Sequence, residues 1–119
     1  MKIYLSQDAV ARALGADAVA AELAKHDVEL IRVGSRGMTW LEPLAEVEID
    51  GVRHAFGPVS AADVPALIDG TLEGHGPTEE IPFFANQTRL TFQRCGVIDP
   101  LDLDAYRAHG GLVGLERAL

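Results

Sequence analysis

The only residue of this 119-residue chain with thiol chemistry is Cys95. Dithiol exchange needs a second cysteine in a C-x-x-C pair, and the chain has none. A single reactive thiol would need a neighbouring base, and the histidine nearest in sequence is His109. Two hypotheses follow: Cys95 is a small packing residue, or it is the working thiol of a stand-alone redox protein.

The four histidines are scattered along the chain: His26, His54, His75 and His109. No two of them have the short spacing that is typical of metal ligands. The alternation of neighbouring residues places His54 on the apolar face of a strand, where a core or edge histidine is the usual occupant. We therefore predict no catalytic, cofactor-binding or metal-binding residue in this chain.

The loop at residues 34–42 (GSRGMTWLE) carries the best candidates for contacts with another protein. Its first four residues form either an anion-binding turn clamped by Arg36 or plain turn chemistry between two strands. Trp40 is either a lid on the core or an exposed contact residue. The predicted partner contacts are Arg36, Trp40 and Glu42.

The formal charge of −8 originates in the middle of the chain, where residues 42–80 hold nine acidic side chains and one basic side chain, Arg53. A surface of this sign repels phosphates, which argues against nucleic-acid binding. The acidic region is expected to be either a solvated face or a docking surface for a basic partner.

Length and composition are those of a single soluble domain, with 48 % hydrophobic and 24 % charged residues. No apolar run approaches the roughly 18 residues of a membrane span, and no charged-then-apolar leader opens the sequence. One cysteine cannot form an internal disulfide, which fits a reducing compartment. These features predict a cytoplasmic protein without a membrane partner.

Strand and helix signals alternate at the start of the chain. β-branched and aromatic residues predict strands at residues 2–5 and 28–33. Between them, Asp8 leads a short helical turn that stops at Gly15, and Asp17 is predicted to cap a helix over residues 18–25. This order predicts a right-handed crossover between two parallel strands.

The clearest local signal is the dipeptide Asp50-Gly51, which suits a type I′ turn between strands at residues 45–49 and 52–56. On the polar face of this hairpin, Glu48 is predicted to lie opposite Arg53 as a cross-strand charge pair. The register set by the turn gives three pairs on the apolar face: Ile49 with Val52, Val47 with His54, and Ala45 with Phe56.

A further helix is predicted from Val64, with Asp63 as its cap, Pro65 in its first turn and Gly70 past its end. The order β-α-β-β-β-α predicts an α/β protein: a thioredoxin-like, four-stranded mixed sheet with helices packed on it.

Three segments divide the chain. Residues 1–72 are predicted to form the thioredoxin-like domain, and residues 73–85, rich in Gly, Pro and charge, a linker. Residues 86–119 are predicted to add a C-terminal helical extension, in which Asp102 caps a short helix. A final helical stretch runs to Leu119, where the chain is expected to stop in the middle of an element.

Two blocks of the sequence resemble a known family. GSRGMTWLEPLAEVE, residues 34–48, is similar to the loop and hairpin of thioredoxin-like [2Fe-2S] ferredoxin domains in NADH-dehydrogenase-type complexes. RLTFQRCGVIDPLDLDAYRAHGGLVGLERAL, residues 89–119, is similar to the opening of the FMN- and NADH-binding flavoprotein subunit of complex I and its relatives. Together they most resemble the β subunits of NAD-dependent formate dehydrogenases, with hydrogenase diaphorase subunits as the alternative. Residues 86–119 would then be the incomplete start of the flavoprotein domain.

The resemblance also shows which ligands are missing. Thiolates hold an iron–sulfur cluster, and Cys95 lies outside the ferredoxin-like part. The family's cysteine positions are occupied here by Ser6 and Gln7 in one loop and by Ser35, Arg36, Met38 and Thr39 in the other.

The resemblance therefore implies an accessory or assembly domain without a redox centre of its own, in a complex that passes electrons from formate through iron–sulfur clusters and FMN to NAD. The 119 residues alone are expected not to be catalytic. The FMN, NAD and [4Fe-4S] sites of the family would lie past Leu119. The implied partners are the rest of the flavoprotein subunit, the molybdenum or tungsten catalytic subunit and the small iron–sulfur subunit.

Overall fold

The computed structural model describes all residues from 1 to 119, and its centre is a four-stranded sheet in the order β2-β1-β3-β4. The strands are β1 (Lys2–Ser6), β2 (Glu29–Val33), β3 (Ala45–Ile49) and β4 (Val52–Phe56). β1 runs parallel to β2, whereas β3 is antiparallel to both β1 and β4. The prediction of a four-stranded mixed sheet in an α/β protein is confirmed.

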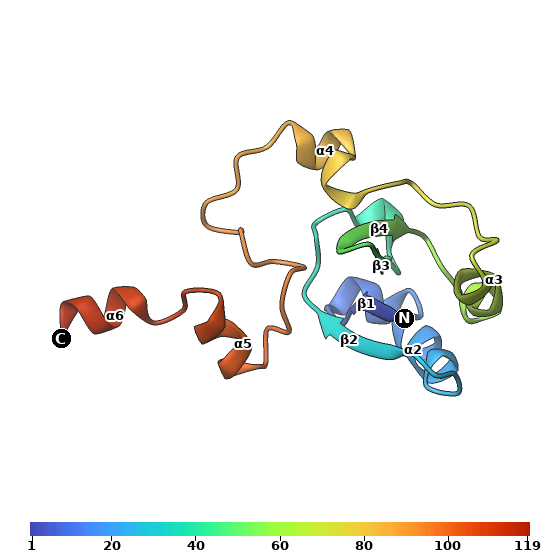
Figure 1. Ribbon diagram of the computed structural model, residues 1–119, viewed down its shortest axis with the longest axis horizontal. Helices are drawn as coiled ribbons and strands as arrows, with labels where there is room; N and C mark the ends of the chain where they lie inside the picture. The colour runs from blue at the N-terminus through green and yellow to red at the C-terminus, as the bar shows by residue number, and fades with distance from the viewer.

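Three helices supply the apolar residues that cover one face of this sheet: α1 (Ala9–Ala13), α2 (Ala16–Leu23) and α3 (Val64–Asp69) (Figure 1). Alternate residues of the strands point to opposite faces, so β1 and β3 present an apolar side to these helices and a polar side away from them. The apolar side and the helices together bury Ile3, Leu5, Ala11, Ala16, Val19, Leu23, Ala45, Val47, Val59, Val64 and Leu67.

The β3–β4 hairpin has the register that its turn residues predict. Ala45 lies opposite Phe56, and Glu48 lies opposite Arg53. Asp50 and Gly51 both adopt left-handed backbone angles, with φ of 51° and 79°, as a type I′ turn requires. This turn matches the right-handed twist of the two strands, which is why a two-residue loop is enough to fix the pairing.

The start of α2 differs from the prediction. Gly15, with φ of 107°, turns the chain from α1 directly into α2, so the helix begins at Ala16 and ends at Leu23. Asp17 is therefore not the cap: it lies in the first turn of α2, where its carboxylate accepts from Arg12 and Arg32 at 2.9 Å each. A glycine in the left-handed conformation makes this sharp entry possible at little steric cost.

The cap of α3 also differs. Asp63 precedes α3 as predicted, but its side chain makes no capping bond to that helix. It accepts instead from the backbone N–H and the hydroxyl of Ser60, at 2.8 and 2.7 Å. These bonds organise a preceding turn, η2 (Ala61–Asp63), while Pro65 and Gly70 keep their predicted places at the two ends of α3.

The segment predicted as a linker, residues 73–85, is ordered along the edge of β4. Ala55 N–H donates to the carbonyl of Gly76, and His75 N–H donates to the carbonyl of Ala55. The chain then forms η3 (Thr78–Glu80) and α4 (Pro82–Ala85), which bury Thr78 and Phe84. Main-chain bonds thus hold the segment that was predicted as a linker to the edge of the sheet.

Beyond α4, the chain makes a wide loop and then forms α5 (Leu103–Ala108) and α6 (Val113–Ala118). Figure 1 shows these two helices standing away from the sheet, which gives the molecule its 50 × 31 × 30 Å extents. Asp102 caps α5 as predicted, accepting from the backbone N–H groups of Asp104 and Ala105. No helix combines the length and the apolar character needed to cross a membrane.

Replacing Gly51 by alanine should lower the free energy of unfolding by about 1–2 kcal/mol, because a Cβ is strained at positive φ. Urea unfolding followed by far-UV circular dichroism measures this change. The control is Gly114→Ala, at a helical position in α6 with open space for a Cβ, which should cause no loss. Equal behaviour of the two variants would contradict the turn assignment.

Candidate functional site

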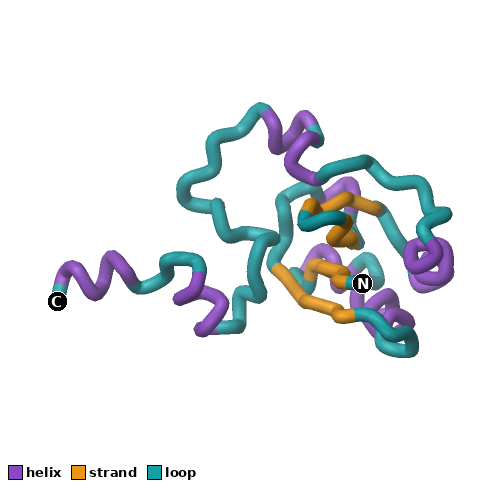
Figure 2. The backbone as a smooth tube through the Cα atoms, viewed as in Figure 1, coloured by secondary structure: helices purple, strands orange, loops and turns teal.

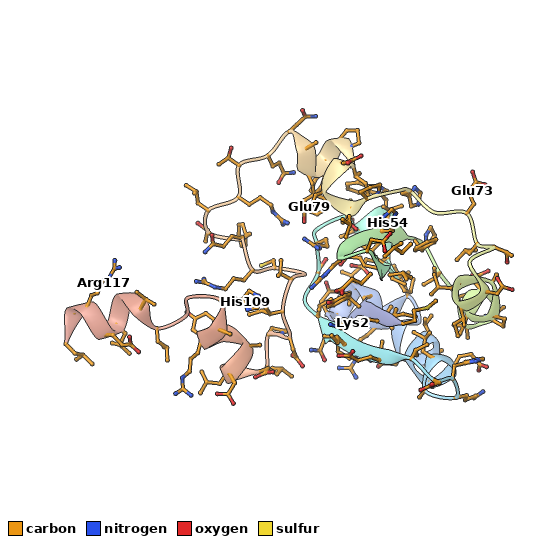
Figure 3. All side chains as sticks on the ribbon, in the orientation of Figure 1. Lys2, His54, Glu73, Glu79, His109 and Arg117 are labelled. Carbon is orange, nitrogen blue, oxygen red and sulfur yellow. The ribbon has the colours of Figure 1, made fainter.

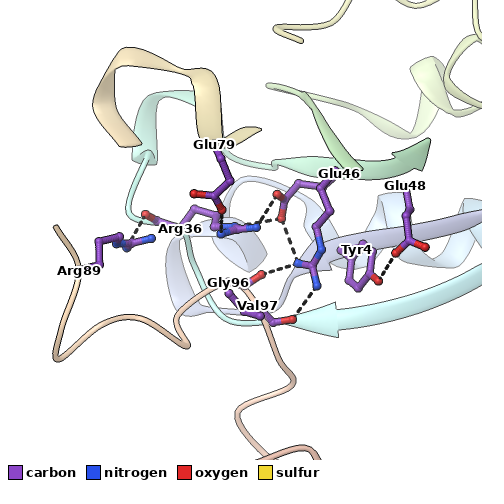
Figure 4. Close-up of polar contacts among 9 residues, drawn as sticks. Tyr4, Arg36, Glu46, Glu48, Glu79, Arg89, Gly96 and Val97 are labelled. Carbon is purple, nitrogen blue, oxygen red and sulfur yellow. Dashed lines mark hydrogen bonds and ion pairs between the residues drawn. The ribbon is translucent and has the colours of Figure 1, made fainter. Parts of the chain in front are cut away.

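The polar face of the sheet is centred on an ion-pair cluster formed by Arg36, Glu46, Arg53 and Glu79 (Figure 4). Arg36 donates from Nε and Nη2 to the two oxygens of Glu46, at 3.2 and 2.9 Å. Its remaining terminal nitrogen, Nη1, donates to Glu79 at 2.8 Å. Only 5 % of Arg36 is exposed, so this predicted contact residue lies in the interior of the structure.

Glu46 is buried because of its position in β3. It pairs with Tyr4 of β1 on one side and with Ala55 of β4 on the other, so it lies in the middle of the sheet. Burying an unpaired carboxylate there would be strongly unfavourable. Two arginines compensate its charge: Arg36 makes a bidentate contact, and the Nη1 of Arg53 lies 3.6 Å from the carboxylate.

Arg53 connects the cluster to a distant part of the chain. Its guanidinium lies 3.4 Å from the centre of the Tyr4 ring and donates to the carbonyl oxygens of Gly96 and Val97, at 2.9 and 2.8 Å. The predicted charge pair between Glu48 and Arg53 has the right register, but no ion pair joins the two. Glu48 instead accepts from the Tyr4 hydroxyl at 2.7 Å, while Arg53 turns toward Glu46.

A second buried carboxylate, Glu42, lies beside the loop ends. It accepts from the N–H of Leu44 at 2.9 Å and from the hydroxyl of Ser35 at 3.2 Å. Burial raises the pKa of Glu42 above its ordinary value, and the nearby charge of Asp8 acts in the same direction. The bond from Leu44 opposes this increase only in part. Glu42, the second predicted contact residue, therefore also lies in the interior.

These positions can be compared with a [2Fe-2S] site, which needs thiolate ligands. Ser6 and Met38 are buried, and Ser35 is engaged with Glu42. Gln7 donates to Asp99 at 2.8 Å, which ties the first loop to residues far along the chain. The residues do not fit a cluster, because Ser, Gln, Arg and Met side chains hold these places and already have protein partners or core packing. No three His, Cys, Asp or Glu side chains gather as a metal-binding group.

Trp40 is the predicted contact residue that the structure leaves available. Its side chain is 58 % exposed, and its ring meets the edge of Phe83 with centroids 5.2 Å apart. The alternative of a core lid is thereby excluded. The acidic region is likewise split, since Glu42 and Glu46 are internal while other acids, such as Glu79, remain accessible.

Next to Phe83 lies a hollow of about 560 Å³. It is bounded on one side by residues 35–37 and on the other by the loop that follows α4. The hollow is lined by Ser35, Arg36, Gly37, Phe83, Gln87, Thr88, Arg89, Leu90, Thr91, Phe92 and Cys95.

Cys95 is half-buried in the wall of this hollow. No hydrogen bond joins it to His109, the histidine nearest in sequence, whose Nδ1 lies 2.9 Å from the carbonyl oxygen of Ala105. The other histidines are equally dispersed, and Figure 3 shows His54 and His109 on different parts of the molecule. The structure thus gives Cys95 neither of the partners that sequence reasoning considered for thiol chemistry.

Sequence reasoning missed Glu46 and Arg53 as the centre of the polar face. A signal was present, since the hairpin register places both on the same side of the sheet as Glu48. It did not reveal that this side would be covered by residues 96–98.

Comparison with protein-family models found no match for this chain, and no curated protein matches it either.

Removing the carboxylate of Glu46 should be the most damaging single change on this face. Glu46→Ala leaves Arg36 buried without its main partner, and we expect a loss of about 3–5 kcal/mol in the free energy of unfolding. Glu48→Ala, in the same strand, removes one hydrogen bond from Tyr4 and should cost about 1 kcal/mol. Urea unfolding at neutral pH distinguishes the two, and similar losses would contradict a central role for Glu46.

The raised pKa of Glu42 predicts a pH-dependent effect of Glu42→Gln. The folded protein holds this proton more tightly than the unfolded chain, so wild-type stability falls as pH rises from the ordinary value of 4.5 through the folded pKa. The amide can keep both hydrogen bonds. The variant should therefore gain stability relative to wild type across this window and keep the gain at neutral pH.

Asp63→Asn is the matched control with the opposite sign. Hydrogen bonds from the Ser60 hydroxyl and backbone N–H lower the pKa of Asp63. Its contribution is present above the ordinary carboxyl pKa and is lost as pH falls through the folded value, so this variant should be weakened only toward neutral pH. Chemical unfolding from pH 3 to pH 8 tests both. A pH-independent difference for Glu42→Gln would count against the buried carboxyl.

Proposed function

We propose that this chain is an accessory or assembly domain of the flavoprotein β subunit of an NAD-dependent formate dehydrogenase. The parent complex would pass electrons from formate through iron–sulfur clusters and FMN to NAD. In this proposal the 119 residues carry no redox centre and serve to position or dock neighbouring parts of the complex.

The fold supports a thioredoxin-like assignment for residues 1–72. The sheet order β2-β1-β3-β4, the parallel β1–β2 pair and the antiparallel β3–β4 hairpin follow the arrangement expected for such a domain. The first family-like block, residues 34–48, spans the loop after β2 and almost all of β3. This is the place that the corresponding loop and hairpin have in the ferredoxin-type domains that the block resembles.

The observation that carries the proposal is the state of the former ligand loops. Ser35 bonds to Glu42, Arg36 bonds to Glu46, and Met38 is fully buried. The loop at residues 34–42 is thus closed by structural contacts, which in this proposal stand in place of a cluster. We expect a domain that is retained for docking or assembly to keep its sheet, while its ligand loop gains structural contacts of this kind.

The C-terminal part supports the same proposal by its exposed apolar residues. The segment from residue 100 onward presents four leucines to solvent: Leu101, Leu103, Leu115 and Leu119. Helices of this kind are expected to pack on something, because apolar side chains that cluster on a surface favour association. In the proposal they pack on the remainder of the flavoprotein domain, which would hold FMN, NAD and a [4Fe-4S] cluster.

A hydrogenase diaphorase subunit is the alternative parent, and the same features support it. A stand-alone thiol redox protein has one observation in its favour, the place of Cys95 in the wall of the hollow. If that alternative holds, Cys95→Ser should abolish a thiol-dependent reductase activity of the purified chain, and the assembly proposal would be abandoned.

The proposal predicts that the purified chain binds the molybdenum or tungsten subunit, or the small iron–sulfur subunit, of a formate dehydrogenase. Affinity capture with each purified subunit measures this binding, and Trp40→Ala should weaken it. Leu14→Ala provides the control, because Leu14 is equally exposed but follows α1 on the other side of the sheet.

Binding only to the hydrogenase counterparts would instead identify the diaphorase parent. Failure to bind any of these subunits would overturn the proposal. The purified chain should also show no stoichiometric iron and no visible absorption, and a bound chromophore would contradict the absence of a redox centre.

A further inference from the structure

The loop of residues 86–95, which we call the excursion, leaves the body of the protein and returns to it (Figure 2). Both of its ends are fixed. At the start, Phe84 is buried, and at the end Arg53 holds the carbonyl groups of Gly96 and Val97. Loops that a rigid scaffold holds in position frequently carry binding residues, because the scaffold presents their exposed side chains.

The excursion lies in a stretch whose charge differs from the rest of the chain. From Ile81 to Ile98 there is no acidic residue, although the chain has 18. The two cations of the stretch, Arg89 and Arg94, form no ion pair, whereas five other arginines do: Arg12, Arg32, Arg36, Arg53 and Arg107.

Arg89 lines the hollow and is held in place without being neutralised. It lies 4.7 Å from the centre of the Phe84 ring and donates one hydrogen bond, at 3.2 Å, to the carbonyl oxygen of Arg36. A guanidinium has five N–H donors, so most of those on Arg89 have no protein acceptor. A guanidinium with free donors and no ion-pair partner is suited to bind a carboxylate in a charge-assisted, bidentate contact.

Exposed apolar side chains surround this cation. Leu90 is 78 % exposed and Phe92 is 64 % exposed, and both line the hollow together with Phe83. Trp40 extends the apolar rim through its edge contact with Phe83. Aromatic residues and arginine are the residue types that dominate the binding energy of protein interfaces. A volume of about 560 Å³ is large enough to receive several side chains of a partner.

We propose that the hollow beneath the excursion is a docking site for an acidic, apolar peptide segment of a protein partner. A carboxylate of the segment binds Arg89, and a neighbouring apolar side chain inserts between Phe83 and Phe92. Charge complementarity selects this occupant, because the site is a basic and apolar patch on a protein of formal charge −8. The proposal is independent of the parent complex, since it depends only on these residues.

The chain contains two natural reporters for this site. Trp40 is the only tryptophan and lies at the rim, and Cys95 is the only cysteine and lies in the wall. The probe is a capped hexapeptide of four glutamates and two phenylalanines, with a lysine-for-glutamate peptide as its counterpart. Titration at low salt should give a saturable change in Trp40 fluorescence with the acidic peptide, at least tenfold tighter than with the basic one. The acidic peptide should also slow alkylation of Cys95.

Arg89→Glu should weaken the acidic peptide at least tenfold. Arg117→Glu changes the net charge equally at an exposed, unpaired arginine of α6, and it should leave the affinity within twofold of wild type. Because Arg89 also packs on Phe84, Thr88→Glu is a second test: it adds a negative charge to the lining at an exposed position and should weaken binding without affecting folding.

Three results would overturn the proposal. They are equal responses to the acidic and basic peptides, unchanged binding in both Arg89→Glu and Thr88→Glu, and a concentration-dependent dimer by light scattering in which Cys95 is protected without peptide. The last result would assign the hollow to a second copy of the chain.

Discussion

The structure depends above all on one buried carboxylate, Glu46, in the middle of a central strand. A charge at this position is tolerated because two arginines from different parts of the chain reach it. Arg36 brings the loop after β2, and through Glu79 the turn η3, onto the polar face of the sheet. Arg53 brings residues 96 and 97 to the same place. The electrostatic requirement of Glu46 therefore organises three segments on this face: the loop after β2, the turn η3 and residues 96–97.

The two faces of the sheet are consequently stabilised by different kinds of interaction. The face under α1, α2 and α3 is held by apolar burial, which is insensitive to direction. The opposite face combines a small apolar group around Met38 and Phe84 with directional ion pairs and cation–ring contacts. Directional contacts fix the positions of the loops that they hold, and this is the property required of loops that frame an interaction surface.

Local features were predictable from the sequence, whereas the polar face was not. The Asp50-Gly51 turn and the alternation beside it determine the β3–β4 register within a dozen residues, so that the pairing could be derived correctly. Asp102 likewise caps its helix through neighbouring backbone groups. Arg36, Glu42 and Glu46 depend on partners and covering segments elsewhere in the chain, so their burial could not be inferred from local pattern. Asp17 and Asp63 were predicted to cap helices, but each bonds to another side chain instead, and the local pattern does not reveal this competition.

The contact between Arg53 and residues 96–97 has an evolutionary consequence. Arg53 binds main-chain carbonyl oxygens, which every residue type supplies, and not the side chains of Gly96 and Val97. Position 97 is consequently free to drift in sequence while the attachment persists. Position 96 is not free, because its backbone has φ of 77° and a Cβ there would collide with Arg36. Among homologues of this chain, the residues at positions 36 and 96 should therefore covary, whereas position 97 should vary independently of both.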